Sequence, residues 1–374
     1  MAQKSKNKIG ITGAGASGCI CAYWLLKAGL DVTLFDKNLP LRTLIPTGGG
    51  RCNLAHAEYD FRELAKNYPR GEKFLYSVFS RFSTAETLEM FEKMGIKTYT
   101  QDDGRIFPES NSSKDVQEKI LREIRNSGVK FIQKEITSVE NLMKEFDSVV
   151  IATGGHSGYE LLKHAGVSIV EPHPALVGLN TKEDLKELSG TVVKGGNING
   201  VKGDVLFTHF GVSGPLIYKI SSINAFKVMP YKLAIDLSPK LTDLQEKLNI
   251  YPHKEIKNLL GQYLPQKVVK YLLKDFDETK EACKIDGKTR DLILDKIHNF
   301  IITVTGTNQG EETVTAGGVD LDEINSKTME VKKVPNLYCI GELLNIDGFC
   351  GGFNLQNAWS TAFVCAESII EQAK

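Results

Sequence analysis

Three glycines and an aspartate near the start of the sequence have the spacing of a dinucleotide-binding site. Gly13, Gly15 and Gly18 form a complete GxGxxG pattern, and Asp36 follows 23 positions after Gly13. In such a pattern the first glycine permits a tight turn, the second lets the backbone approach a pyrophosphate, and the third lets a helix pack closely on a strand. A carboxylate at the position of Asp36 accepts hydrogen bonds from the hydroxyls of an adenosine ribose.

The segments around these residues predict the strand–helix–strand unit that such a site requires. Residues 8–12 are apolar enough for a buried strand, residues 19–28 are apolar at helical spacing, and residues 31–35 predict a second strand. The start of the helix offers unpaired N–H groups and partial positive charge to phosphates. The predicted contacts to the nucleotide are Gly13, Gly15, Ala16, Ser17, Gly18, Asp36 and Lys37.

Two further segments favour FAD over NAD as the ligand. Residues 47–53, TGGGRCN, place three consecutive glycines where an extended ligand needs close approach to the backbone. Near the end of the chain, a predicted strand at 336–340 leads into a Gly-Glu pair and then an amphipathic helix at 354–371. Rossmann-type flavoproteins return such a unit to the first one. Its acid binds the ribityl chain, and its helix start faces the pyrimidine edge of the flavin.

A buried strand predicted at 148–151 ends in Ala-Thr-Gly-Gly, a turn that lies near the phosphates in such flavoproteins. A plain exit from the strand is the alternative interpretation. Ile136 ends the strand predicted at 129–135, where related folds contact the adenine through the backbone. We expect the FAD to be held without a covalent bond. The predicted contacts outside the first unit are Gly49, Gly50, Arg51, Cys52, Asn53, Ile136, Ala152, Thr153, Gly154, Gly341, Glu342, Asp347, Gly352, Asn354 and Leu355.

A series of motifs runs along nearly the whole chain. In order they are GGGRCNLAH (48–56), DDGRIFPES (102–110), HPALVGL (173–179), LFTHFGVSGP (206–215), TAGGV (315–319) and the continuous segment 328–363. Together they resemble the BaiN/YhiN family of flavoproteins, some of whose members are described as aminoacetone oxidase-like. The resemblance implies FAD binding, a three-part architecture and a two-electron redox role.

The distribution of apolar runs, glycines and prolines along the chain predicts an α/β protein. In it, a Rossmann-type FAD-binding domain carries an inserted antiparallel β domain and a helical subdomain. The FAD-binding domain is expected at 1–171 plus 325–374. Short apolar runs separated by Gly and Asn predict a β-rich substrate domain at 172–240 plus 301–324. Leucine-rich helical stretches punctuated by prolines predict a helical insertion at 241–300.

Flavins perform hydride chemistry themselves, so a dedicated catalytic base is not required. His209, in a polar glycine-rich loop, is the candidate catalytic residue, because a histidine can shuttle a proton near neutral pH. The alternative is a structural loop whose histidine caps backbone groups. Cys52 has no nearby cysteine partner, which argues against a redox disulfide beside the flavin. Because no second GxGxxG follows, NAD(P)H is expected at most as a reductant that binds transiently.

Composition restricts the class of protein further. Lys plus Arg and Asp plus Glu both number 46, so the formal net charge is zero and no nucleic-acid partner is expected. No apolar run is long enough to span a membrane, and the first eight residues are polar, without the apolar stretch of a signal peptide. The seven cysteines are scattered, so we expect reduced thiols, no metal site and a cytoplasmic location.

The function predicted from these features is that of an FAD-dependent oxidoreductase. A small amine or NAD(P)H passes a hydride to the flavin, and O₂ or another acceptor reoxidises it. Two alternatives from other classes stay open, an RNA-modifying flavoprotein and a flavin-binding sensor without turnover. The substrate is expected to be a small molecule, and the sequence does not fix the oligomeric state.

Overall fold

A computed structural model describes residues 7–308 and 314–374 of the chain. The first six of the polar residues at the start therefore lie outside the described residues. Backbone contacts divide the chain into two compact units, one ending at His173 and resuming at Val314, the other starting at Pro174. None of the helices in the described ranges is long and apolar enough to cross a membrane.

The first unit is built on a parallel five-stranded sheet with the strand order β16-β7-β1-β2-β6. The central strand β1 pairs with β2 on one side, where Ile9 lies opposite Val32, and with β7 on the other. Residues 9–12 of β1 are buried, as expected for a strand covered on both faces. The bounds are β1 Lys8–Thr12, β2 Asp31–Asp36, β6 Lys130–Gln133, β7 Ser148–Ile151 and β16 Leu337–Cys339.

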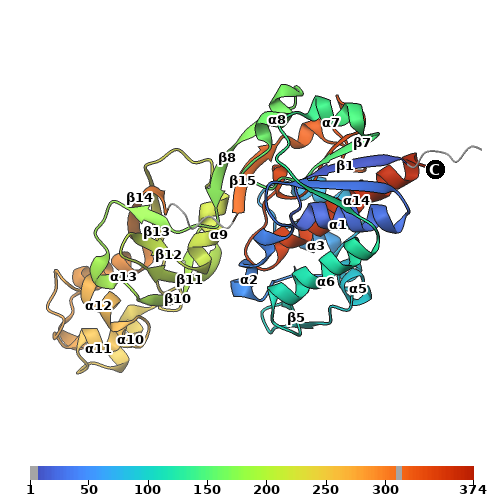
Figure 1. The fold of residues 1–374 in the computed structure, drawn as a ribbon. Helices are drawn as coiled ribbons and strands as arrows, with labels where there is room; N and C mark the ends of the chain where they lie inside the picture. Colours follow the sequence, from blue (N-terminus) through green and yellow to red (C-terminus); the bar gives the residue numbers. More distant parts are fainter. Residues whose placement is uncertain (1–6, 309–313) are drawn as a thin grey trace, which may run out of the picture. The chain divides into compact units, whose positions relative to one another are not determined.

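Two helices from opposite ends of the sequence pack against each other beside this sheet (Figure 1). They are α1 (Ala16–Lys27) and α14 (Phe353–Gln372). Most of the side chains of α14 are buried, including the large indole of Trp359. Helices from distant parts of the sequence therefore pack together beside one sheet, as the predicted return of the C-terminal segment requires.

Smaller elements complete the first unit. A three-stranded antiparallel sheet has the order β3-β5-β4, and β8 pairs with β15. Helix starts are marked by side-chain caps: Ser83 and Glu86 form a capping box on α5, and Ser112 accepts a hydrogen bond from the N–H of Asp115 on α6. The bounds are α2 Thr47–Gly50, β3 Ala55–His56, α3 Phe61–Ala65, α4 Glu72–Phe79, α5 Thr84–Lys93, β4 Thr98–Thr100, β5 Arg105–Pro108, α6 Ser113–Asn126, α7 Val139–Glu145, α8 Tyr159–His164, β8 Ile169–Ala175 and β15 Val314–Val319.

The second unit contains a six-stranded antiparallel sheet with the order β10-β11-β12-β9-β14-β13. Its outer strands β10 and β13 also meet, because the backbones of Asn197 and Asp236 exchange two hydrogen bonds of 2.9 Å. Strand β13 alternates buried and exposed residues, as one solvated face requires. The bounds are β9 Leu179–Thr181, β10 Val192–Ile198, β11 Val201–Phe207, β12 Gly211–Ser213, β13 Tyr231–Ile235 and β14 Phe300–Thr307.

The helices of the second unit share their core with this sheet. Helix α9 follows β12, and four helices lie between β13 and β14 in the sequence. Buried residues of those helices, such as Leu260 and Ile297, belong to the same apolar cluster as Val205 of the sheet. The bounds are α9 Pro215–Ile223, α10 Leu244–Ile250, α11 Ile256–Leu260, α12 Gln266–Leu272 and α13 Gly287–His298. The predicted fold class, a Rossmann-type sheet with a separate antiparallel sheet domain, is confirmed.

Candidate functional site

The carboxyl ends of the parallel strands bring together predicted contact residues from distant parts of the sequence. Gly13 follows β1, Asp36 ends β2, Ala152 follows β7 and Gly341 lies just beyond β16. Because neighbouring parallel strands end at the same edge of a sheet, these residues gather there. Ligands of open α/β sheets bind at this edge.

Two of the three glycines in the GxGxxG pattern are required by the fold itself, because a side chain there would clash, and the third is not. Gly13 has a φ of 103°, and a Cβ there would lie 2.2 Å from the carbonyl oxygen of Ala152. At Gly18 a Cβ would lie 1.9 Å from the carbonyl oxygen of Gly13. Gly15 has an ordinary φ of −79°, and its Cβ would meet only the Oγ1 of Thr43, at 3.9 Å. The glycine at position 15 therefore leaves room beside the backbone for a ligand.

Asp36 lies next to this loop and holds it in place. Its Oδ2 accepts a hydrogen bond of 2.7 Å from the N–H of Ala14, and its Oδ1 accepts one of 2.7 Å from the N–H of Asn38. Each carboxylate oxygen has a further lone pair, so both can still accept hydrogen bonds from ribose hydroxyls. Its neighbour Lys37 points its ammonium at Glu135, 2.9 Å away, and Ile136 is half-buried against the sheet core.

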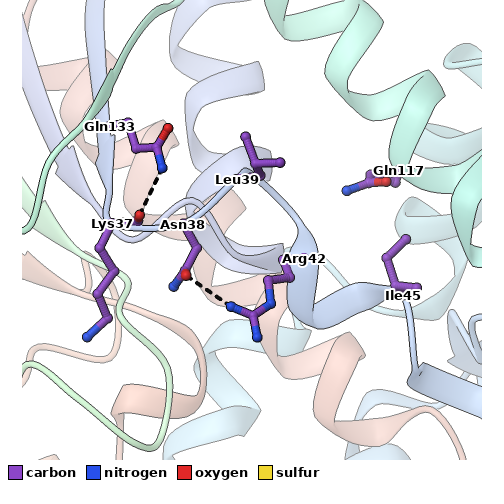
Figure 2. Close-up of a pocket in the computed structure, with 7 residues that line it drawn as sticks. All are labelled: Lys37, Asn38, Leu39, Arg42, Ile45, Gln117 and Gln133. Atoms are coloured by element: carbon purple, nitrogen blue, oxygen red, sulfur yellow. Dashed lines mark hydrogen bonds between the residues drawn. The ribbon is translucent and has the colours of Figure 1, made fainter.

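A cavity of about 340 Å³ lies beside the end of β2 (Figure 2). Two hydrogen bonds shape its wall, one from Gln133 Nε2 to the carbonyl of Lys37 at 3.1 Å and one from Arg42 Nη1 to Asn38 Oδ1 at 3.0 Å. The lining residues are Lys37, Asn38, Leu39, Arg42, Ile45, Gln117 and Gln133.

The segment 47–53 has an unusual backbone. Gly48, Gly49 and Gly50 have φ values of 58°, 68° and 82°, and Cys52, which is not a glycine, has a φ of 63°. At Gly49 and Gly50 a Cβ would meet nothing within 4 Å. The guanidinium of Arg51 stacks on the ring of Phe107, 4.2 Å from its centre. All three glycines adopt the left-handed conformation, and Gly49 and Gly50 also leave an open surface, whereas a Cβ at Gly48 would lie 2.8 Å from the backbone nitrogen of Asn53.

Cys52 is fully buried, and burial raises the pKa of its thiol to about 12. A thiol with such a pKa is protonated and unreactive at neutral pH, because the thiolate is the reactive form.

The start of α14 is held by polar groups that turn toward the protein. Gly352, the residue before the helix, has a φ of 97°, and a Cβ there would lie 2.4 Å from the carbonyl oxygen of Ala55. The side-chain oxygen of Asn53 accepts from the N–H of Gly352 at 2.9 Å. Asn354 forms two hydrogen bonds of 2.8 Å with the backbone of Gly348. The next predicted contact residue, Leu355, is half-buried.

The two acids of the C-terminal segment have different environments. Asp347 is completely buried, and both of its carboxylate oxygens accept hydrogen bonds from the guanidinium of Arg70. Glu342 forms no ion pair with any of the described residues, and its Oε1 accepts from the N–H of Thr315 at 3.0 Å. Burial raises the pKa of the Glu342 carboxyl, an effect that the Thr315 N–H opposes. Asp347 therefore supports the structure around α14, whereas the carboxylate oxygens of Glu342 can still accept further hydrogen bonds.

The turn after β7 is closed by Thr153, whose Oγ1 donates to the carbonyl of Ser157 at 2.7 Å. The following Gly154 has a φ of 75°, and a Cβ there would meet nothing within 4 Å. At Gly341 a Cβ would lie 2.5 Å from the Oγ of Ser17, so this glycine brings the C-terminal segment against the start of α1.

Sequence reasoning missed four residues that fix the start of α14. Arg70 pairs with Asp347, and the hydroxyl of Tyr68 donates to the carbonyl of Phe353 at 2.6 Å. His56 stacks on the ring of Phe353, with ring centres 4.7 Å apart, and Trp359 Nε1 donates to the carbonyl of Leu54 at 2.9 Å. No local pattern signals these residues, since their partners lie about 280 to 305 positions away.

The candidate catalytic residue His209 lies in the second unit, in the short connection between β11 and β12. The N–H of Thr208 donates to the carbonyl of Gly211 at 2.9 Å, which makes this connection tight. His209 is exposed, and its ring lies edge-on to the ring of Phe210, with ring centres 5.2 Å apart. An exposed imidazole is accessible to a substrate.

The geometry of the first unit fits FAD, the ligand that the sequence predicts. Backbone at Gly15, Gly49 and Gly154 borders open space that a side chain would fill, as a ligand pressed against the backbone requires. The start of α1 offers backbone N–H groups suited to phosphates, and the carboxylate of Asp36 offers acceptors suited to ribose hydroxyls.

Comparisons with known proteins agree with this geometry. The family model described as HI0933-like protein Rossmann domain matches residues 7–368. The ribosomal RNA dihydrouridine synthase of Escherichia coli (strain K12) is 30% identical over 396 aligned positions, covering 96% of this chain and 97% of the relative. A protein of the same name from Haemophilus influenzae is also 30% identical, covering 100% of both chains.

Two further similarities are more distant. The 3-dehydro-bile acid delta(4,6)-reductase of Clostridium scindens is 27% identical, covering 98% of this chain and all of the relative. Among solved structures, the open conformation of a flavocytochrome c3 fumarate reductase superposes with a TM-score of 0.50 at 15% identity. That match covers 100% of this chain and 79% of the other. At that identity the structural likeness concerns the fold alone.

Proposed function

This chain belongs to the HI0933-like Rossmann family and is an FAD-dependent oxidoreductase, and from this premise we propose that it reduces uridine in ribosomal RNA to dihydrouridine. The family resemblance and the enzyme class predicted from the sequence are thereby confirmed. The observation that carries the proposal is that two relatives, each 30% identical and matching over at least 96% of this chain, are both named for that product.

A third relative supports the chemical class of the reaction. Its name describes reduction of double bonds in a 3-dehydro-bile acid, and both named reactions saturate a carbon–carbon double bond conjugated to a carbonyl group. Such a bond accepts a hydride on one carbon and a proton on the other. When bound, FAD supplies the two-electron hydride chemistry. In the balanced reaction NAD(P)H gives the hydride and becomes NAD(P)⁺, and the proton comes from solvent or from a protein acid.

The chain's own residues would place the cofactor as follows. The Gly13–Gly18 turn and the start of α1 hold the phosphates, and Asp36 accepts from the adenosine ribose. Glu342 accepts from the ribityl chain, and the start of α14 presents N–H groups to the pyrimidine edge. His209 is the candidate proton donor to the substrate carbon.

Charge in the second unit supports an RNA substrate, although the whole chain has no net charge. Residues 189–235 contain five lysines and a single acid, Asp204. Lys194, Lys202, Lys227 and Lys232 are exposed. Phosphate contacts by such side chains supply most of the affinity of proteins for nucleic acid. The same stretch leaves the ring of Phe226 42% exposed, and exposed aromatic rings stack on unpaired bases.

The direct test incubates the purified yellow protein without oxygen, with NADH or NADPH and ribosomal RNA that lacks dihydrouridine. Digestion to nucleosides and mass spectrometry should then detect dihydrouridine only when protein and reduced nicotinamide are both present. Triple replacement of Lys194, Lys202 and Lys227 by Gln should weaken RNA binding and reduce its salt dependence. Reduction of a steroid enone but not of RNA would instead favour the bile-acid type of substrate. Bleaching of the flavin by amines alone would favour the small amine that the sequence predicts, beside NAD(P)H, as the hydride donor.

A further inference from the structure

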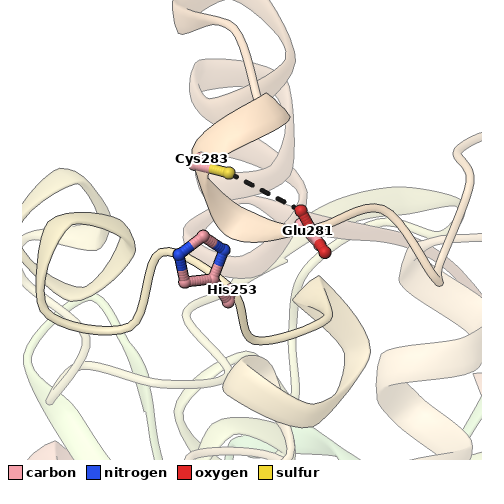
Figure 3. A group of neighbouring side chains, drawn as sticks. All are labelled: His253, Glu281 and Cys283. Atoms are coloured by element: carbon pink, nitrogen blue, oxygen red, sulfur yellow. Dashed lines mark hydrogen bonds between the residues drawn. The ribbon is translucent and has the colours of Figure 1, made fainter.

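Three side chains with metal-binding atoms converge in the helical part of the second unit. They are His253, Glu281 and Cys283, and one ligand atom from each lies within 4.8 Å of the other two. Figure 3 shows the three side chains facing a common space, with the thiol of Cys283 donating to Glu281 at 3.8 Å. His253 and Cys283 are exposed, so an ion can reach the cluster from solvent.

The backbone holds the two contributing segments together independently of these side chains. The N–H of Cys283 donates to the carbonyl of Pro252 at 2.8 Å, and the N–H of Ala282 donates to that of Lys254 at 2.9 Å. A third hydrogen bond of 2.9 Å joins Ile256 to Lys280. Ile256 and Ala282 are buried and fix both segments to the core of the unit. The backbone positions of the three ligand residues are therefore set before any ion binds, and only their side chains have to move.

We propose that His253, Glu281 and Cys283 bind one divalent transition-metal ion of the zinc type, with water as the fourth ligand. An imidazole nitrogen, a carboxylate oxygen and a thiolate sulfur are the ligands that zinc takes from proteins. Metal–ligand bonds of about 2.0–2.3 Å place tetrahedral ligand atoms about 3.5 Å apart. The side chains must therefore close by roughly an ångström, which surface rotamers allow. Carboxylate and thiolate together neutralise the two charges of the ion.

One neighbouring residue competes with the ion. The ammonium of Lys284 lies 3.1 Å from Glu281 Oε2, and this ion pair must open or shift when a metal binds. Removing that charge should therefore strengthen metal binding, whereas removing a ligand should weaken it. Opposite changes in metal affinity on replacing Lys284 and on replacing a ligand would distinguish a specific site from general attraction of cations to exposed acids.

A bound ion would connect two segments that lie 28 residues apart in the sequence, from His253 to Glu281. It would thereby fasten the connection between α10 and α11 to the segment that precedes α13. Because an ion that binds the folded form raises apparent stability by mass action, zinc should raise the Tm of the protein.

The test uses the full-length protein, treated with a chelator and titrated with Co²⁺ as a spectroscopic probe. One equivalent of Co²⁺ should produce a sulfur-to-metal charge-transfer band that Zn²⁺ abolishes by displacement. Cys283→Ser should abolish this band, and His253→Ala should weaken binding at least tenfold. Lys284→Met should tighten binding severalfold. Cys350→Ser is the matched control, since Cys350 is the other exposed cysteine within the described ranges.

A second measurement locates the ion in the unmodified protein, so that it does not depend on whether the variants fold. Zn²⁺ should protect Cys283 from alkylation, read by peptide mass spectrometry, and leave Cys350 unprotected. Equal protection of both cysteines, or unchanged zinc affinity in Cys283→Ser with His253→Ala combined, would overturn the proposal. Circular dichroism of each variant establishes that the fold is retained.

Discussion

The N-terminal and C-terminal segments of the candidate site contain similar residue types but use them differently. In the N-terminal segment, Gly15 borders open space, and the Asp36 carboxylate accepts hydrogen bonds from the backbone N–H groups of Ala14 and Asn38. In the C-terminal segment, Asp347 pairs with Arg70, and Asn354 bonds to the backbone of Gly348. The first segment presents its polar groups outward, and the second directs most of them inward.

This difference suggests a division of work between side chains and backbone. A polar side chain at the start of α14 determines where the helix begins, and the backbone N–H groups of its first turn then face outward as the ligand groups. We infer that most of the polar side chains in the C-terminal motif position this helix, and that Glu342 is its ligand-facing acid.

The largest expected effect is the loss of stability when the Arg70–Asp347 ion pair is broken. Replacing Asp347 with Asn should lower the unfolding free energy of the apoprotein by about 3–5 kcal/mol, because the guanidinium of Arg70, only 14% exposed, then loses the carboxylate that neutralises it. Urea unfolding measures this loss. Glu89→Gln is the control, since its pair with Lys93 is exposed and screened by solvent and should contribute little to stability. If Asp347→Asn costs no more than the control, Asp347 does not have the structural role assigned above.

A second pair of variants separates glycines needed by the fold from the glycine needed by the ligand. Gly13→Ala should destabilise the apoprotein by about 1–3 kcal/mol, since it forces an unfavourable φ and a clash with Ala152. Gly15→Ala should leave apoprotein stability within about 0.5 kcal/mol of the parent. It should nevertheless weaken FAD binding at least tenfold, or about 1.4 kcal/mol. Fluorescence titration with FAD measures the second effect, and parental FAD affinity in Gly15→Ala would contradict the comparison.

A substitution of Asp36 tests the same region. Asp36→Ala removes acceptors for the ribose hydroxyls and should weaken FAD binding by about 1–3 kcal/mol, roughly tenfold to a hundredfold. Asp31→Ala is the matched control, because Asp31 begins the same strand and its carboxylate pairs with the exposed ammonium of Lys130. Equal affinities of the two variants would mean that the ribose lies elsewhere.

The parts of the fold that follow from local pattern were predictable. The strand, glycine turn, helix and second strand at residues 8–36 are contiguous, so periodicity and glycine spacing suffice to place them. The return of α14 beside α1 was predictable from a motif that accompanies flavoproteins, not from periodicity.

Contacts between distant residues were not predictable. Arg70 and Asp347 are separated by 277 positions, and neither carries a local signal that names the other. The cluster of His253, Glu281 and Cys283 escaped notice for the same reason, because its residues do not have the spacing of a recognised metal motif. Whole-chain net charge similarly concealed the lysine-rich stretch at 189–235, since a sum of zero says nothing about distribution.

The smallest expected effect concerns Glu342 and appears as a dependence of stability on pH. Burial raises the pKa of this carboxyl in the folded state, so the unfolded chain releases its proton first as pH rises. The contribution of Glu342 to stability is therefore fully present below its unfolded pKa of about 4.5 and decreases as pH rises through the folded value. Glu342→Gln cannot titrate, so the Tm of the variant apoprotein minus that of the parent should increase with pH across this window and then level off.

Glu86 provides the opposite comparison within the same unit. Burial raises the pKa of the Glu86 carboxyl, but hydrogen bonds from Ser83 lower it by more, so its folded pKa lies below the unfolded value. Its contribution is present above about pH 4.5 and is lost as pH falls through the folded value. For Glu86→Gln the Tm difference should therefore change on the acidic side of pH 4.5, whereas for Glu342→Gln it changes on the basic side. A Tm difference for Glu342→Gln that is constant with pH would show that its carboxyl is solvated, and the inferred ligand-facing acid would have to be sought elsewhere.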